Sequence, residues 1–322
     1  MKSIDLSIKN LKSFKNNLSI CLGYFDGIHI GHKKILERCS LKAKYEKAIL
    51  TFSEPISNYI INNKSKEILT SLTDRFRISS RYDLDYFIIF HIDKDFLNLS
   101  PMEYIDILKK MNVKEIFCGS DYRFGKSASG DINLLKQFFD VNVVDLYSVN
   151  GNKVSTQEII NNLKEGNIKI ANELLGQHYQ ICGTVVSGHH NGEKFNIRTA
   201  NIKFDANYVV PLFGVYKVII YIDNRPYLGI ANIGVHPTID KEEKPILEVH
   251  IPSFNENIYG KNVYVEFLDF IRKEKKFNNT DELVDQINSD MKVAGLLWYL
   301  ENILINIIKN IGIFFLLLLF VL

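Results

Sequence analysis

The apolar pattern of this chain changes at residue 179, and this change constrains the fold more than any other feature. Before it, short apolar runs alternate with helix-like stretches, such as the helix expected over residues 33–44. Apolar runs separated by helices predict a parallel sheet with both faces covered, here an open α/β sandwich of the Rossmann-like kind. The expected strands are residues 18–22, 48–52, 86–91, 115–118 and 141–145.

After residue 179 the apolar side chains recur at every second position, with Gly, Pro, Asn and Asp between the runs. Several short strands at this spacing predict a small antiparallel β-barrel. A final helix is expected with Thr280 as its cap, because Asp281 and Glu282 suit a first helical turn. The expected strands are residues 179–186, 215–222, 227–232, 246–251 and 263–268.

The length of 322 residues favours two domains over one core. We expect an α/β domain over residues 1–157, a helical connector over residues 158–178 that breaks at Gly166, and the barrel domain over residues 179–295. Residues 296–322 form a hydrophobic tail. Its last twelve residues have no polar side chain, whereas a membrane-spanning helix needs about 20 apolar residues. A short buried helix, a membrane-surface or tail anchor that gives membrane contact, and a frameshifted read-through all remain open.

The composition excludes several classes of function. A net charge of +2 gives no support for binding to nucleic acid. The four cysteines, Cys21, Cys39, Cys118 and Cys182, include no CxxC pair, which argues against a zinc site or a disulfide framework. They suit apolar packing in a reducing compartment. The first residues have no apolar core of signal-peptide length, so a cytoplasmic location is expected.

Residues 23–32, which read GYFDGIHIGH, predict a phosphate-binding turn between a strand and a helix. Gly23 and Gly27 allow the chain to turn sharply off the strand, and Gly31 leaves room for a purine on the backbone. The two histidines stand three residues apart, on one face of a starting helix whose N-terminus already attracts anions. Both imidazoles can donate hydrogen bonds to phosphate oxygens as negative charge moves during the transfer. The pattern therefore indicates nucleotidyl transfer from ATP.

This turn closely resembles the GxFDGxHxGH signature of the bacterial bifunctional riboflavin kinase/FMN adenylyltransferase family, also called FAD synthetase. Residues 119–125, GSDYRFG, resemble the family's G-x-[DN]-[FY]-x-F-G block at a strand end, and residues 96–101, FLNLSP, resemble its F-x-x-L-S-P segment. Core packing of Tyr122 and Phe124 is the alternative, but the adjoining Gly-Lys-Ser favours a solvated loop.

The second half resembles the riboflavin kinase part of this family almost to residue 292. It keeps the landmarks GVY at residues 214–216, ANIGVHPT at 231–238 and LEVH at 247–250. The family's G-F-P-T-A-N block reads NIRTAN over residues 196–201, so the Thr and Asn remain while the Gly, Phe and Pro do not. An edge strand with incidental polar residues is the competing interpretation of that block.

The resemblance implies two ATP-dependent steps, phosphorylation of riboflavin to FMN and adenylylation of FMN to FAD with release of pyrophosphate. The implied catalytic residues are Asp26, His29 and His32 in the first domain, and Glu248 as the general base in the barrel. The implied nucleotide-binding residues are Gly23, Phe25, Gly27, Gly31, Ser155, Thr156, Gly183, Gly188, Thr199 and Asn201. The implied flavin-binding residues are Asp121, Tyr122, Phe124, Gly125, Arg272 and Phe277.

The resemblance also implies Mg²⁺ as the cofactor of ATP, with flavins as substrates and products. Thr199 and Asn201 would hold the metal, because hydroxyl and amide oxygens are hard ligands that suit Mg²⁺. Riboflavin, FMN and ATP are then the partners, and no oligomeric state is implied.

The chain departs from the family pattern in both halves. After the last strand, the family has an arginine that holds the triphosphate, and Ile160 stands in its place. Lys126 or Lys153 could substitute, although a lysine lacks the fork of arginine. Residues 51–55 also lack the family's F-x-P-H-P spacing. FMN adenylyltransferase activity alone, kinase activity alone, and a catalytically weak flavin-binding relative therefore remain as alternatives.

Overall fold

The chain forms two compact units in a computed structural model that describes residues 1–60, 66–145, 147–149, 151–187, 199–235, 245–277 and 279–296. The first unit contains Met1–Asn162, Ile170–Gln177 and Ala206–Val209. The second contains Leu163–Lys169, His178–Asp205 and the chain from Val210 onward. No helix in the described ranges is long and apolar enough to cross a membrane.

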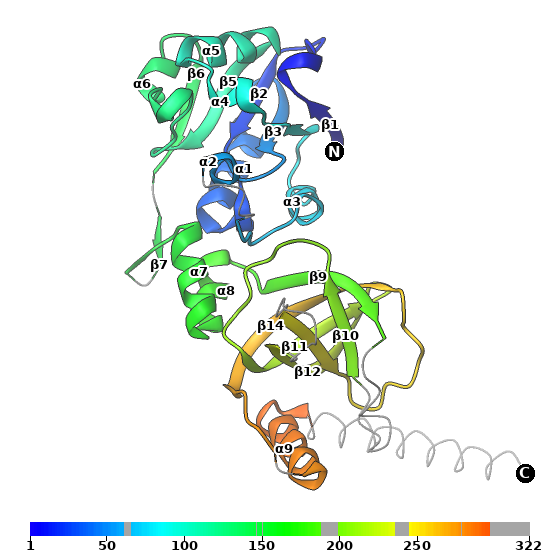
Figure 1. The fold of residues 1–322 in the computed structure, drawn as a ribbon. Coiled ribbons are helices and arrows are strands. Elements are labelled where there is room, and N and C mark those ends of the chain that lie inside the picture. Colours follow the sequence, from blue (N-terminus) through cyan, green and yellow to red (C-terminus); the bar gives the residue numbers. More distant parts are fainter. Residues whose placement is uncertain are drawn as a thin grey trace, which may run out of the picture. The chain divides into compact units, whose positions relative to one another are not determined.

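The first unit is built on a parallel six-stranded sheet in the order β1-β4-β3-β2-β5-β6 (Figure 1). The strands are β1 (Lys2–Leu6), β2 (Leu18–Leu22), β3 (Glu46–Phe52), β4 (Tyr86–Phe90), β5 (Val113–Gly119) and β6 (Asp140–Val144). This confirms the open α/β sheet expected from the alternation of apolar runs and helices. The expected strands omitted β1, a short segment that is mostly exposed and pairs with β4 at the edge of the sheet.

Helices cover both faces of this sheet. Leu18, Ile20 and Leu22 of β2 belong to one core cluster with α5, whereas Cys21 packs in a second cluster with α1. Successive strand residues point to opposite faces, so a strand that is apolar at every position needs cover on both. The helices are α1 (Ile30–Lys42), α2 (Ser57–Ile60), α3 (Leu72–Ser79), α4 (Lys94–Leu97), α5 (Pro101–Lys110) and α6 (Ile132–Leu135).

Two helices, α7 (Thr156–Glu165) and α8 (Ile168–Leu175), follow a short two-stranded ribbon of β7 (Ser148–Val149) and β8 (Asn152–Lys153). The break expected at Gly166 is confirmed, since this glycine has a φ of +82° between the helices. A left-handed backbone angle ends a helix cheaply only at glycine.

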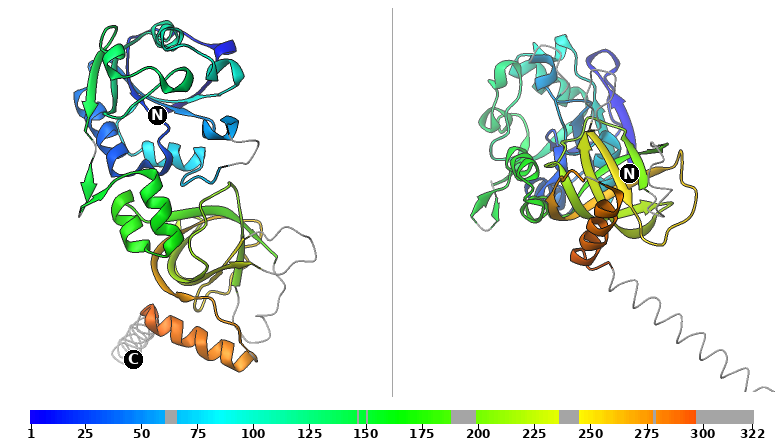
Figure 2. Two further views of the ribbon diagram at one scale, coloured as in Figure 1. Left: turned by 60° about the vertical axis from the view of Figure 1, so that its left-hand side comes forward. Right: turned by 60° about the horizontal axis from the view of Figure 1, so that its bottom comes forward.

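The second unit is a closed antiparallel barrel, which is visible in the left view of Figure 2. Its strand order is β10-β13-β12-β11-β14-β9. The strands are β9 (Tyr179–Val186), β10 (Thr199–Phe204), β11 (Gly214–Ile222), β12 (Arg225–Val235), β13 (Pro245–His250) and β14 (Asn262–Lys273). The predicted barrel is thus confirmed. The edge-strand interpretation of residues 196–201 is wrong for Asn201, which is paired with Glu248 of β13 on one side and with Val186 of β9 on the other.

The final helix α9 (Thr280–Val293) packs on the barrel through Met291 and Ala294, which form a cluster with Val215 and Ile230. Its cap is Asn279, whose side chain accepts a hydrogen bond from the Glu282 N–H at 2.9 Å. The cap predicted at Thr280 is therefore wrong by one residue. Asparagine and threonine both cap helices, so the sequence alone did not distinguish them.

Candidate functional site

The topology of the parallel sheet creates a switch point between β2 and β5. The strand order runs from β2 through β3 and β4 in one direction and through β5 and β6 in the other. In open parallel sheets, ligands bind outside the carboxyl ends of the strands where the order reverses. Gly23 follows β2 and Gly119 ends β5, so the two motif segments start at this point.

The turn after β2 has an unusual backbone. Phe25, Gly27 and Ile28 have φ values of 56°, 77° and 40°, and all three are buried. Such angles cost about 1–3 kcal/mol at residues with large side chains and persist only where the surroundings enforce them. A Cβ on Gly23 would lie 3.1 Å from the Phe25 ring, so this glycine makes room for the aromatic side chain.

Asp26 holds the turn in place. Its carboxylate accepts hydrogen bonds from the Leu69 N–H at 2.9 Å, the Thr70 N–H at 2.9 Å and the Thr70 hydroxyl at 3.1 Å. The Thr70 hydroxyl oxygen also accepts from the Gly27 N–H at 2.8 Å. Burial raises the pKa of Asp26, while these donors oppose the shift. Both oxygens of the Asp26 carboxylate therefore accept hydrogen bonds from Leu69 and Thr70, so this side chain positions the turn.

His29 and His32 are brought together as a stacked pair. Their ring centroids lie 3.7 Å apart at an angle of 14°. His29 caps α1, since its Nδ1 accepts from the His32 N–H at 3.3 Å. A Cβ on Gly31 would lie 3.2 Å from the His29 ring, so Gly31 is required for the position of this imidazole. The Phe25 ring lies 5.1 Å from that of His32.

Both imidazoles are held neutral by their surroundings. Burial lowers the pKa of His29 to about 4, although the charge of Asp121 acts in the opposite direction. Burial also lowers the pKa of His32 well below its ordinary value, and the charges of His29 and Arg75 add to that shift. A neutral imidazole offers one N–H donor and keeps one acceptor nitrogen. Within the described residues, His32 Nδ1 is buried without a hydrogen-bond partner.

The loop after β5 packs against the start of α5. The Lys126 N–H donates to Leu99 O at 2.7 Å, and a Cβ on Gly125 would meet the Pro101 backbone at 3.0 Å. These contacts join the two segments that resemble family blocks. Gly125 has a φ of +73°, which an L-amino acid with a side chain would adopt only with strain.

Tyr122 and Phe124 in this loop are packed. Phe124 is 6% exposed and lies in the core cluster, and the hydroxyls of Tyr122 and Tyr104 are 2.9 Å apart. The solvated loop favoured from the sequence is therefore wrong for Phe124, because its ring fills the core beside α5. Asp121, by contrast, is exposed. Contact of these residues with flavin stays a prediction.

The barrel brings residues from five strands into one row. Asn201 of β10 is paired with Glu248 of β13, and Glu248 with Asn232 of β12. Asn232 is paired with Val215 of β11, and Val215 with Arg272 of β14. Residues paired across neighbouring strands project from the same face. Since the alternate positions of these strands are buried, the half-buried Asn201, Asn232 and Glu248 lie on the outer face of the barrel.

Known proteins resemble the chain in both units. A family profile described as FAD synthetase matches residues 11–158, and one described as riboflavin kinase matches residues 175–297. The bifunctional riboflavin kinase/FMN adenylyltransferase of Listeria monocytogenes is 31% identical over 284 residues, which are 85% of this chain and 90% of that protein. The Bacillus subtilis protein of the same name is 32% identical over 286 residues, with 85% and 90% covered. This chain belongs to the bifunctional riboflavin kinase/FMN adenylyltransferase family.

The fold of this chain also resembles that of a solved structure over most of its length. The crystal structure of a protein from Streptococcus pneumoniae named as a macrolide-efflux protein superposes with a TM-score of 0.84 at 30% identity. It covers 91% of this chain and 99% of the streptococcal chain. Only the fold is carried over from that structure.

The third phosphate-binding element expected for the family has a different local role here. Ser155 caps α7, with its hydroxyl oxygen accepting from the Glu158 N–H at 3.2 Å, and Thr156 is the first residue of the helix. Ile160, where the family has arginine, is half-buried. No hydrogen bond among the described residues joins Ser155 or Thr156 to the turn that carries the histidines. Their contact with ATP stays a prediction.

On the barrel, Arg272 is held by α9. Its guanidinium donates to the buried carboxylate of Asp290 at 2.8 and 2.9 Å and lies 5.8 Å from the Phe277 ring. A Cβ on Gly183 would lie 2.2 Å from Lys203 O, so barrel closure alone requires this glycine. Gly188, residues 196–198, residues 237–238 and the tail beyond 296 lie outside the described residues. Roles of Arg272, Phe277 and Gly183 in ligand binding stay predictions.

Two residues near the sites of this family member were missed by the sequence reasoning. Asn232 belongs to the recognised ANIG landmark, but only the strand register places it beside Glu248. Arg75 belongs to no motif, and it is a buried arginine whose charge acts on His32. An arginine in an amphipathic helix is usually exposed, so no local signal distinguished it.

Proposed function

We propose that this chain makes FAD from riboflavin in two steps, with residues 1–157 as the adenylyltransferase and residues 179–295 as the kinase. The observation that carries the proposal is the stacked pair His29 and His32 at the β2–β5 switch point. The family match over both units and the row of Asn201 and Glu248 support the kinase half.

In the adenylyl-transfer step, a phosphate oxygen of FMN attacks the α-phosphorus of ATP. The bond between the α-phosphorus and the oxygen bridging to the β-phosphorus breaks, and pyrophosphate leaves. His29 and His32 donate N–H groups to phosphate oxygens as charge shifts toward the leaving group. Because burial keeps both imidazoles neutral, they change no protonation state in this role. Asp26 acts by holding the turn on Leu69 and Thr70.

In the kinase step, Glu248 takes the proton from the 5′-hydroxyl of riboflavin. The oxygen attacks the γ-phosphorus of ATP, the bond to the β–γ bridging oxygen breaks, and ADP leaves. Thr199 and Asn201 fit a Mg²⁺ ion, because both offer neutral oxygen ligands on the strand next to Glu248. The ion would neutralise charge on the phosphates. Asn232, which is paired with Glu248 on its other side, would orient the carboxylate of Glu248.

The reaction needs ATP, Mg²⁺ and riboflavin together, so we place it in the cytoplasm. Chromatography of products from purified protein with riboflavin and MgATP tests the function. We expect FMN first and then FAD. FAD from supplied FMN with no FMN from riboflavin would reduce the function to the adenylyltransferase. FMN without FAD would point to the kinase alone and to Ile160 as the cause. Neither product across metals and redox states would contradict the proposal.

A further inference from the structure

Arg75 of α3 binds the main chain at the carboxyl ends of two strands. Its Nη1 donates to Tyr24 O at 3.0 Å, Phe52 O at 3.1 Å and the Thr51 hydroxyl at 2.6 Å. Tyr24 lies in the turn after β2, and Phe52 ends β3. The Thr51 hydroxyl donates in turn to Tyr24 O at 2.7 Å. One guanidinium therefore fixes the two strand ends that flank the nucleotidyl-transfer turn.

This guanidinium is buried without a carboxylate partner. Arg75 is 1% exposed, and it forms no ion pair within the described part of the chain. Its Nε atom is buried and lacks a hydrogen-bond partner there. A buried charge that is not paired is strongly unfavourable in the folded chain, and each such group calls for an explanation.

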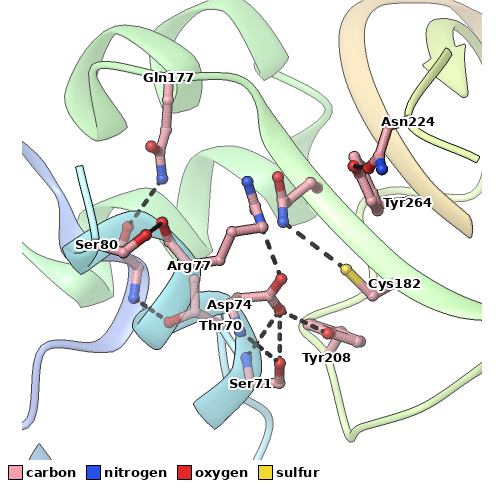
Figure 3. Close-up of polar contacts among 12 residues, drawn as sticks. Thr70, Ser71, Asp74, Arg77, Ser80, Gln177, Cys182, Tyr208, Asn224 and Tyr264 are labelled. Atoms are coloured by element: carbon pink, nitrogen blue, oxygen red, sulfur yellow. Dashed lines mark hydrogen bonds and ion pairs between the residues drawn. The ribbon is translucent and has the colours of Figure 1, made fainter. Parts of the chain in front are cut away.

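The two nearest carboxylates are committed elsewhere. Asp26 accepts from Leu69 and Thr70, as described above. Asp74 accepts from Ser71 at 2.7 Å and from the Tyr208 hydroxyl at 2.7 Å, and it lies 3.7 Å from Arg77 (Figure 3). Both carboxylates act on the charge of Arg75, and the guanidinium lies 4.6 Å from the Tyr24 ring, but neither carboxylate forms an ion pair with it in the described ranges. The positive charge therefore lies directly behind the turn after β2, at the strand ends where the proposed reaction brings together two anionic substrates.

We propose that Arg75 is a positioning residue of the adenylyl-transfer site, which aligns the histidine turn and supplies the fixed positive charge that this chain lacks at Ile160. The inference rests on the proposed function. A fixed cation behind the turn stabilises the negative charge that shifts toward the leaving group in the transition state, and it needs no reorganisation during the reaction. Arg75 does not need to touch a phosphate for this role, because its positive charge lies next to the turn that would bind the phosphates.

The protonation of His32 gives this role a signature that a packing role would not have. The rings that contact His32 are His29 from the cap of α1 and Phe25 from the turn, and the charged groups acting on it are His29 and Arg75. The carboxylate of Asp26 accepts hydrogen bonds from Leu69 and Thr70 and is not among the groups that shift the pKa of His32. The charge of Arg75 lowers the pKa of His32, so removal of the charge should let that pKa rise.

The test compares Arg75→Gln, Arg75→Lys and the control Arg77→Gln in the full chain. Arg77 lies on the same helix and is paired with Asp74. For Arg75→Gln we expect kcat for FAD formation from FMN to fall about 100-fold with little change in the KM for ATP. Arg75→Lys, which keeps the charge but not the fork, should lose about tenfold. Riboflavin kinase activity should stay within about twofold in all three variants, which reports a folded barrel, and hydrogen exchange of peptides from β2 and β3 reports whether the first unit is folded.

NMR titration of the His32 ring in the free protein is the second measurement. We expect the pKa of His32 to rise in Arg75→Gln and to stay at the wild-type position in Arg75→Lys and Arg77→Gln. A folded Arg75→Gln variant with wild-type adenylylation and an unmoved titration would overturn the inference. If Arg75→Gln does not fold, the inference is tested on Arg75→Lys. A wild-type kcat for FAD formation in Arg75→Lys would then overturn the inference. If the wild type makes no FAD, the proposed function fails, while the titration still tests the charge effect.

Discussion

The two candidate sites are organised by different physical means. The adenylyl-transfer turn is fixed by buried polar groups, since Asp26 and Arg75 bind main-chain atoms that come from other segments. The kinase row is fixed by strand register, which places Asn201, Glu248 and Asn232 side by side on the barrel. The first site depends on specific hydrogen bonds, whereas the second depends on a barrel that many apolar residues maintain.

This difference predicts different responses to mutation. In the turn, two residues with side chains, Phe25 and Ile28, have left-handed φ values and must be held against their own backbone preference, so the loss of one partner affects the whole site. On the barrel, the backbone has ordinary strand geometry, and a side-chain change removes one chemical group without moving its neighbours. Mutations that separate the two activities test this contrast.

The largest effect is expected for the double change His29→Ala and His32→Ala. Each donor to a transition-state oxyanion contributes about 10²–10³ in rate, so the pair should lower kcat/KM for FAD formation by about 10⁴-fold. Phosphorylation of riboflavin should stay near the wild-type rate because the barrel is a separate unit. Both rates can be followed by separating the flavins on a column. FAD formation that survives the double change would refute the assignment of the site.

The next effect is expected for Glu248→Gln on the barrel. Removal of a general base slows a reaction by about 10²–10⁴-fold, and we expect about 10³-fold in kcat for FMN formation. Glutamine keeps the size of the side chain, so the barrel should stay folded and FAD formation from FMN should not change. Glu256→Gln, at an exposed loop residue, serves as the control. Equal kinase activity in Glu248→Gln and Glu256→Gln would show that another group accepts the proton.

The residues changed in these two predictions also show which parts of the sites could be predicted from the sequence. The turn is a contiguous motif, so residue types and spacing alone indicated a strand, a turn and a helix with two facing histidines. Thr199 and Glu248 were reached only through resemblance, because a polar residue on a strand is usually a solvated one. Arg75 could not be reached, since its burial depends on how α3 packs against two strand ends. The packing of Phe124 was mistaken for the same reason, because its neighbour Tyr104 comes from another segment.

The pH dependence of stability should distinguish the two units. The pKa of His29 is about 4 in the folded chain and near 6.5 in the unfolded chain, so the unfolded chain binds more protons between these values. The stability contributed by His29 is complete above pH 6.5 and is lost as the pH falls toward 4. At pH 5 the free energy of unfolding is about 2 kcal/mol lower than at pH 7 because of His29. The lowered pKa of His32 decreases it further in the same direction.

Urea unfolding followed by hydrogen exchange of peptides can measure that loss separately for β2 and for β11. His29→Asn keeps a capping side chain but cannot be protonated, so its first unit should lose about 2 kcal/mol less between pH 7 and pH 5. The comparison with wild type removes the opposing effect of Asp26, whose pKa is raised. An identical pH dependence in the variant would mean that His29 is charged in the folded chain.

The smallest effect, and the sharpest on the contrast between the sites, is expected for Gly31→Ala. Alanine favours a helix over glycine by about 1 kcal/mol, so the change should leave the first unit as stable as wild type or slightly more so. Its Cβ would nevertheless lie 3.2 Å from two atoms of the His29 ring, which must shift by a few tenths of an ångström. We expect about a tenfold loss of kcat for FAD formation, because small displacements of aligned groups are costly. Ser40→Ala, on the same helix, should gain stability without loss of activity. Full activity in Gly31→Ala would show that the stacked arrangement of the two imidazoles is not the one used in the reaction.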